Sequence, residues 1–434
     1  MKKLIQCGLA FAVLVTVFVT SARAAAPVAD LNANAAKTIK ASKDPLPVTA
    51  VEYAVVHLAI YDAVESIDKR YQPYYAFVPG ATGSMTAAAA KAAHDALAGL
   101  FPALNYPALA SNIDNDYMNF LTTYGIDPAD PGIAVGAQAA ANILALRAND
   151  GRFPVPPPPP FLGSNAIGQW RPTPSFITTA PPPSGAPGLT PWLANVTPFS
   201  MTSGSQFRVD PPPSLSSDVW AEDYNETMSL GASNSTTRTP EQTDIGYFWA
   251  DSGPALWQNA LQYISRTYLT NIGDSARMFA LADTALADAQ IACWDSKYFY
   301  NFWRPVTAIP LGDQDGNPAT NADPTWEPLI NTPNFPEYPS GHADISGAVS
   351  HALALFFGTD QMSFQMTTTN SNAKLTTRTF SRFSQAEDQV INARVYVGIH
   401  YRNSDRVARA QGLRVANWVF KNYFLPIGDP RFGK

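Results

Sequence analysis

The chain has 434 residues, of which 46% are hydrophobic and 15% are charged, and its formal net charge is −6 at pH 7. This length and hydrophobic fraction exclude wholesale disorder, because such a chain can bury a core that offsets the entropy of ordering. The acidic balance gives no reason to expect a nucleic-acid partner, and two cysteines exclude a disulfide-rich scaffold.

Residues 1–24 have the layout of a signal peptide. Two lysines precede an apolar run from Leu4 to Val19, and small residues stand at the −3 and −1 positions of a cut after Ala24. An uncleaved membrane anchor is the alternative reading, and no later stretch is apolar for the ~20 residues that a span needs. We expect an exported protein, periplasmic or secreted, with no membrane span in the mature chain. Loss of Cys7 would leave Cys293 as its sole cysteine, and therefore no internal disulfide.

Residues 25–434 are predicted to form a single helical domain, and its first part, residues 25–151, has a helical pattern throughout. Apolar residues recur at spacings of three and four from Val51 to Val64. The stretches 87–100 and 134–146 are rich in alanine, which favours helices and allows close packing between them.

Residues 152–215 are rich in proline, including the run from Pro156 to Pro160, which cannot lie inside a helix. A solvated linker is one interpretation. The aromatic residues interspersed in it, such as Trp170 and Phe199, favour a long ordered loop that packs on the body and could wall a pocket.

The helical pattern returns over residues 216–434, the predicted catalytic helices. Thr239 followed by Pro240 is typical of a helix start, and Asp274 is predicted to cap a long helix that runs to about Phe302. Strand alternation is scarce, so the fold class is predicted to be all-α, built as helical bundles. Further helices are expected at Gly341–Phe357, Phe383–Val397 and Asp405–Tyr423.

The chain has five histidines, which narrow the search for chemistry. His57 and His94 lie in apolar helical patterns and are interpreted as core or surface residues. His351 has no recognisable partner. His342 and His400 lie among residues of unusual type, so they are the candidates for proton transfer or ligation.

Lys297 and Arg304 are seven residues apart, which on one helix places both cations on the same face. Like charges on one face need an anion between them, unless the face is simply solvated. The large, usually buried neighbours Trp294 and Trp303 argue against a solvated face. Pro305 should place Arg304 at the end of the helix, pointing into a loop.

Ser340 and Gly341 precede an apolar helix and therefore lie where free backbone N–H groups bind anions. The serine hydroxyl adds a donor, and His342 would stand beside the bound anion, able to give or take a proton near neutral pH. So short a motif is weak evidence by itself.

Arg394 and His400 form the third group, separated by Gly398, a natural helix stop that would let His400 turn back toward the target of Arg394. Asp405 follows at the expected start of the next helix, where N-capping is at least as plausible a role as catalysis. Together the three groups predict a site for a tetrahedral or trigonal-bipyramidal oxyanion, because cations, a hydroxyl and a helix N-terminus all favour negative oxygens.

In order and in internal spacing the three groups resemble the signature shared by vanadium-dependent haloperoxidases and type-2 phosphatidic acid phosphatases. The signature covers residues 294–405. Trp294 and Phe335 make the stretch look like the chloroperoxidase form, whereas bromoperoxidases carry a second histidine at the position of Phe335. The matching motifs are Lys297-x6-Arg304-Pro305, Pro339-Ser340-Gly341-His342 and Arg394-x5-His400.

The resemblance implies an enzyme that uses vanadate and hydrogen peroxide to oxidise halide to hypohalous acid. His400 would be the axial vanadium ligand, and His342 would help to deprotonate hydrogen peroxide, with Lys297 polarising it. Trp294 and Phe335 would shape the halide pocket. An organic acceptor, the halide preference and the oligomeric state are left open. The residues implied to hold the oxygens are Lys297, Arg304, Ser340, Gly341, His342 and Arg394.

Two alternatives stay open. A secreted acid phosphatase would use His400 to attack phosphorus and His342 to protonate the leaving alcohol, and an inactive relative would only bind an oxyanion. Ala393 and Asp405 depart from the phosphatase pattern, which usually has serine before the arginine and aspartate one residue earlier. An acid that pairs with Arg394 is expected, with Asp244 and Asp251 as weak candidates.

Overall fold

The computed structural model describes residues 27–430, so the predicted signal peptide lies outside the described residues. Residues 27–42 are helical. The helices of the first half are α2 (Leu46–Asp68), α3 (Met85–Leu100), α4 (Pro107–Tyr124) and α5 (Gly132–Leu146), followed by the short helices η1 (Pro191–Asn195) and η2 (Gly204–Phe207). The remaining elements are α6 (Asp218–Gly231), α7 (Pro240–Phe248), α8 (Gly253–Tyr268), α9 (Ile272–Tyr300), α10 (Pro305–Ala308), η3 (Ile309–Gln314), α11 (Gly341–Phe357), β1 (Gln361–Thr367), β2 (Thr377–Arg382), α12 (Phe383–Tyr396) and α13 (Arg402–Asn422).

The predicted all-α fold class is confirmed, with one small exception. β1 and β2 pair antiparallel, with Phe364 opposite Phe380 and their rings stacked 5.3 Å apart. The alternation of Met362, Phe364 and Met366 is a strand signal that sequence analysis missed because the segment is short.

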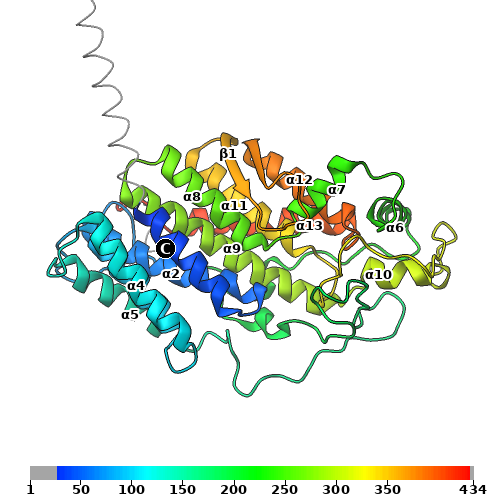
Figure 1. The fold of residues 1–434 in the computed structure, drawn as a ribbon, viewed down its shortest axis with the longest axis horizontal. Helices are drawn as coiled ribbons and strands as arrows, with labels where there is room; N and C mark the ends of the chain where they lie inside the picture. The colour runs from blue at the N-terminus through cyan, green and yellow to red at the C-terminus, as the bar shows by residue number, and fades with distance from the viewer. Residues whose placement is uncertain (1–26, 431–434) are drawn as a thin grey trace, which may run out of the picture.

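Helix α9 runs along the long axis of the molecule and is buried over most of its length by α2, α11 and α13 (Figure 1). The predicted cap of this helix was wrong, whereas its end lies within two residues of the predicted one. Asn271 is the N-cap and accepts hydrogen bonds from the next N–H groups, while Asp274 lies in the first turn. The helix ends at Tyr300, because Asn301 adopts a left-handed conformation with φ 50°.

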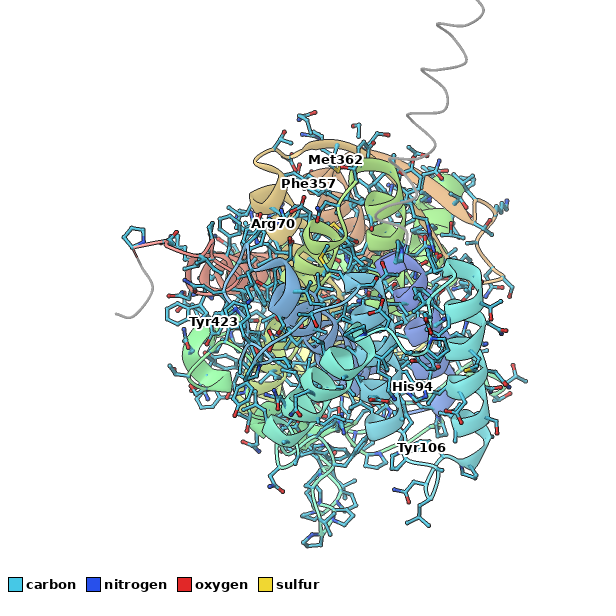
Figure 2. The ribbon with its side chains drawn as sticks, turned by 90° about the vertical axis from the view of Figure 1, so that its left-hand side faces the viewer. Arg70, His94, Tyr106, Phe357, Met362 and Tyr423 are labelled. Carbon is cyan, nitrogen blue, oxygen red and sulfur yellow. The ribbon has the colours of Figure 1, made fainter. Side chains whose placement is uncertain are left out.

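Arg70 ties the end of α2 to the beginning of α9, at the end of the molecule that Figure 2 shows. Its guanidinium donates to Asp274 at 2.7 Å and to Asn271 at 2.8 Å. Glu65 accepts from the backbone N–H groups of Arg70 and Tyr71. The N-terminal helices are therefore joined by partly buried polar contacts, as well as by the apolar core, to the helix that carries Lys297.

The proline-rich stretch 152–215 is an ordered loop, as predicted, that crosses one side of the body (Figure 1). Its strongest attachment is Asp288 on α9, a fully buried carboxylate that accepts from the backbone N–H groups of Phe199, Ser200 and Met201. Trp170 and Phe199 are buried against the body. Buried aromatic rings and satisfied backbone groups distinguish this loop from a solvated linker.

Helices α11 and α13 pack most extensively on one another, and glycines allow their close approach. A Cβ atom on Gly412 would lie 2.1 Å from the carbonyl oxygen of Asp344, and one on Gly347 would lie 2.6 Å from that of Arg409. This contact sets the relative position of Ser340 and His400, which lie just before the two helices.

We expect Gly412→Ala to lower the free energy of unfolding by about 1–3 kcal/mol or more, the usual cost of overpacking. Chemical denaturation measures this. Ala410→Ser, on an exposed part of the same helix, should change stability by no more than about 0.5 kcal/mol. Equal stability of both variants would show that the helices can separate without cost.

Candidate oxyanion site

The three predicted motifs meet around the side chains of Phe335 and His400. Lys297 Nζ and the guanidinium carbon of Arg304 lie 5.1 Å and 4.8 Å from the centroid of the Phe335 ring. Arg304 Nη1 is 3.0 Å from His400 Nε2. Arg394 and His342 are also close enough to His400 for their charges to lower its pKa. The site therefore gathers parts of the chain from residue 297 to residue 400.

Lys297 and Arg304 reach the site by a route that the sequence analysis did not predict. Lys297 lies in the last turn of α9, but Arg304 has extended backbone angles and lies just before α10. Pro305 disfavours the helical conformation for the residue before it, so the two cations do not share a helix face. They converge because residues 301–304 turn the chain back across Phe335.

Ser340 is the N-cap position of α11, and Gly341 and His342 form its first turn, as predicted. The ring of His342 is oriented by a 2.9 Å contact between its Nε2 and the backbone oxygen of Asp251. Because a carbonyl oxygen only accepts, Nε2 carries the proton and Nδ1 is the free acceptor of the neutral ring.

Gly398 ends α12 with a φ of 74°, as predicted, and lets the chain turn between Arg394 and His400. Arg394 Nη1 donates to the backbone oxygen of Trp249 at 2.8 Å. The loop 249–251 thus holds both Arg394 and His342, since Asp251 supplies the carbonyl that contacts His342.

The structure contradicts the N-capping interpretation of Asp405, and it pairs neither of the weak candidates, Asp244 and Asp251, with Arg394. Asp405 is not an N-cap: α13 begins at Arg402, and Asp405 is fully buried near Ser340 and Arg394, where its charge opposes the lowering of the pKa of Arg394 by burial. Asp244 instead pairs with Arg378 at 2.6 Å. The carboxylate of Asp251 accepts from Thr369 and Thr368. Sequence separation alone could not show which acid the fold places beside the arginine.

Sequence analysis also missed Glu337, which is fully buried and contacts His400 Nδ1 through Oε1 at 2.7 Å. A charged residue between two prolines, three residues before the helix N-terminus, was the available signal. Charged residues are rarely fully buried without a partner, so an acid in an otherwise apolar stretch is a candidate for a site.

The electrostatics of the site are dominated by burial. Lys297 and Arg304 are completely inaccessible to solvent, and Arg394 and His400 are nearly so. Burial is the main reason that the pKa of Lys297 is lowered to about 8 and that the pKa values of Arg304 and Arg394 are lowered to about 10. Burial, reinforced by the cations, holds the pKa of His400 well below its usual value, and that of His342 at about 3. Both imidazoles are therefore neutral at physiological pH.

Buried donors of both arginines in the site lack a hydrogen-bond partner among the described residues. They are Arg304 Nη2 and Arg394 Nε, whereas Ser340 lies beside the carboxyl group of Asp405. Leaving a buried donor unpaired costs about 1–3 kcal/mol, and more for a charged group. An oxyanion with several acceptor oxygens would satisfy all of them, so the donor set fits vanadate or phosphate.

Lys297 differs from the arginines because its ammonium is already satisfied. Nζ donates to the backbone oxygens of Pro336 and Glu337 at 3.0 Å each, and to that of Pro339. These carbonyls fix the position of the charge, and an approaching anion would compete for one of the three N–H groups.

We expect the affinity for sulfate, an oxyanion that does not titrate in this range, to fall as the pH rises through about 8. A lysine whose pKa is lowered to about 8 loses its charge above that pH, so the charge-dependent affinity should decrease toward about tenfold per pH unit. Calorimetry between pH 6.5 and 9 measures this. Lys297→Met should bind sulfate more weakly and lose this limb. If the sulfate affinity of the wild type did not change over this pH range, the charge of Lys297 would not control sulfate binding.

Trp294 and Phe335 lie together at the edge of the site, with ring centroids 5.0 Å apart. The proline-rich loop holds the indole, because Trp294 Nε1 donates to Thr190 Oγ1 at 3.1 Å. Phe335 and His342 are partly exposed, whereas the three cations and His400 are buried. Phe335 and His342 therefore lie nearer to solvent than the cations and His400.

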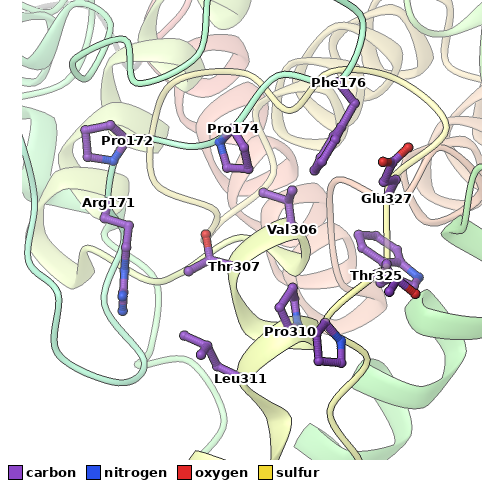
Figure 3. Close-up of a pocket in the computed structure, with 12 residues that line it drawn as sticks. Arg171, Pro172, Pro174, Phe176, Val306, Thr307, Pro310, Leu311, Thr325 and Glu327 are labelled. Carbon is purple, nitrogen blue, oxygen red and sulfur yellow. The ribbon is translucent and has the colours of Figure 1, made fainter.

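The proline-rich loop also walls a cavity of about 350 Å³, which lies between Arg171, Phe176, Thr307 and Trp326 (Figure 3). None of the predicted site residues lines it. The loop thus contacts the site through Trp294 and walls a separate cavity beyond α10.

The comparisons with known proteins agree with this geometry. Residues 277–427 match the model of the VCPO second helical-bundle domain, and this range contains all three motifs. A bacterial vanadium-dependent iodoperoxidase structure aligns with a TM-score of 0.76 and 24% identity over 92% of this chain and 96% of that chain. The chain has the vanadium haloperoxidase fold.

An apo-type bacterial vanadium-dependent chloroperoxidase shares this haloperoxidase fold, with a TM-score of 0.70 and 17% identity over 87% of this chain and 93% of that chain. The vanadium chloroperoxidase of Curvularia inaequalis is 32% identical over 200 residues, which are 38% of this chain and 32% of that protein. The chain thus matches about a third of that relative's length. The resemblance to vanadium-dependent haloperoxidases is confirmed.

None of the helices within residues 27–430 is both long enough and apolar enough to cross a membrane.

Proposed function

We propose that the chain is a vanadium-dependent haloperoxidase that oxidises halide with hydrogen peroxide to hypohalous acid. One observation carries this proposal: Arg304 Nη1 contacts the unprotonated nitrogen of His400 at 3.0 Å, and the two buried arginines near this imidazole each keep an unpaired donor. Buried cations that keep unpaired donors in a dry site favour an oxyanion, and a neutral imidazole beside them can act as a ligand.

The roles of the residues follow from their positions. Arg304, Arg394 and Ser340 would hold the oxygens of vanadate, together with the N–H of Gly341, and His400 Nε2 would be the ligand to vanadium. When bound, vanadate supplies a Lewis acid that would activate peroxide toward attack by a nucleophile.

In this proposal His342 accepts a proton, and Lys297 supplies a positive charge. His342 is neutral and partly exposed, with Nδ1 free to accept a proton from incoming hydrogen peroxide. Lys297, held by three carbonyls, keeps a positive charge where electron density develops. Trp294 and Phe335 would exclude water from the halide, and hypohalous acid would leave past them toward any organic acceptor.

Phosphate-ester hydrolysis is the second candidate, and the pair of Glu337 and His400 favours it. A carboxylate on Nδ1 directs the lone pair of Nε2 outward, which is what a histidine nucleophile needs to attack phosphorus. The acid is Glu337 and not an aspartate four residues after the histidine, where phosphatases carry it and this chain has Ser404, so this chain reaches the arrangement by a different residue.

The experiment that separates these functions combines metal analysis with two assays of the purified protein. Peroxide-dependent halogenation of a dye that requires added vanadate, together with about one vanadium per chain, supports the first. Hydrolysis of a phosphate monoester that vanadate inhibits supports the second. Sulfate binding without either activity would leave an inactive oxyanion-binding relative.

We also propose that the protein is exported, on the signal-peptide layout of residues 1–24. Expression of the full chain with N-terminal sequencing of the mature product tests this, and a mature N-terminus at Ala25 is expected. Retention of Met1 in a cytoplasmic product would contradict it.

A further inference from the structure

We propose that Glu337 is the positioning residue of the site: it fixes the proton of His400 on Nδ1 and directs the Nε2 lone pair at the bound oxyanion. This inference rests on the proposed function. Glu337 Oε1 lies 2.7 Å from His400 Nδ1 and accepts from the backbone N–H of Tyr401 at 3.1 Å. The acid and the imidazole are both buried, so water does not compete for this contact.

The hydrogen-bond pattern leaves a single arrangement of protons for the neutral ring. Arg304 Nη1, 3.0 Å from Nε2, is a guanidinium nitrogen and can only donate, so Nε2 must present its lone pair. A neutral imidazole carries one proton, which is therefore on Nδ1. Glu337 Oε1 must then accept from both Nδ1 and Tyr401, as a carboxylate oxygen can.

The same residue also positions Lys297 through its main chain. The carbonyl oxygen of Glu337 accepts from Lys297 Nζ at 3.0 Å, and its N–H donates to the carbonyl of Phe302 at 2.9 Å. Prolines at 336 and 339 restrict the surrounding backbone. Glu337 thus contacts two side chains of the site: its main-chain carbonyl oxygen contacts Lys297, and its carboxylate contacts His400.

Positioning and simple charge predict opposite effects of removing the carboxylate. As a charge alone, Glu337 opposes the three cations, so Glu337→Gln would strengthen the binding of every anion. As the positioning residue, it makes Nε2 a better ligand, so the same change would weaken vanadate, which takes a ligand from the histidine. Sulfate forms no such bond and should bind equally well or more tightly.

The first test is therefore calorimetric titration of the unloaded full-length protein with vanadate and, separately, with sulfate. Glu337→Gln should weaken vanadate by about 10–100-fold, as for other residues that hold a metal ligand, while sulfate is unchanged or strengthened. Glu337→Asp, which keeps the carboxylate, should recover part of the vanadate affinity. Glu65→Gln is the matched control, a buried glutamate that accepts backbone hydrogen bonds far from the site, and should alter neither anion.

Equal or tighter vanadate binding by Glu337→Gln would overturn the inference, and so would parallel weakening of both anions, which indicates a collapsed site. The second test needs no anion. Histidine labelled with ¹⁵N should show His400 protonated at Nδ1 in the wild type, assigned by its loss in His400→Asn, and altered in Glu337→Gln. A proton on Nε2 in the wild type would overturn the inference. Failure of the wild type to bind vanadate, with the Nδ1 proton present, would instead remove the proposed function.

Discussion

Replacing His400 by asparagine should weaken vanadate binding by at least about a thousandfold, which corresponds to about 4 kcal/mol, and should abolish vanadate-dependent halogenation. His400 presents the lone pair of a neutral imidazole nitrogen, Nε2, beside the buried arginines, because Nδ1 is engaged by Glu337. Asparagine lacks an atom at Nε2, so the ligand is lost while the cations stay. Titration with vanadate measures the effect.

Asparagine is chosen over alanine because its amide can still donate to the buried carboxylate of Glu337. Removing one partner of a buried pair costs about 3–5 kcal/mol, and His400→Ala risks unfolding for that reason. Sulfate affinity is the internal control and should stay close to that of the wild type. Persistent halogenation by His400→Asn would show that the ligand assignment is wrong.

Replacing His342 by alanine should lower kcat for peroxide-dependent halogenation by roughly 10²–10⁴-fold, the usual contribution of a general acid or base. Vanadate affinity should change much less, because the proposed role of His342 is proton transfer and not ligation of vanadium. Burial and the charges of Arg394 and Lys297 hold the pKa of His342 at about 3, so the ring is unprotonated throughout the physiological range.

The separation of turnover from binding is the informative part of the His342→Ala experiment. Steady-state assays at saturating vanadate give kcat, and calorimetry gives the vanadate affinity independently. Asp251→Ala offers a comparison, because it leaves the backbone oxygen that orients His342 and removes only the carboxylate, which binds Thr368 and Thr369. A loss of vanadate affinity as large as the loss of kcat would assign His342 to anion binding.

The sequence by itself determined the types of residue in the site and their local frames. Ser340 and Gly341 lie at a helix N-terminus because a helix-breaking proline precedes an apolar helical run, and Gly398 ends its helix because it adopts a positive φ. Local propensity of this kind depends on neighbours in the chain, which are visible in the sequence. The order and spacing of three such motifs were specific enough to indicate the fold.

Only the tertiary structure decided which acid serves which cation or imidazole. Asp405, Asp244 and Glu337 are all acids near the motifs, yet Glu337 contacts His400, Asp405 lies beside Arg394, and Asp244 pairs with Arg378. These pairings depend on the close packing of α11 on α13 and on the turn that Pro305 imposes after α9. Charge pairing acts through space over a few ångströms, and separation along the chain does not encode it.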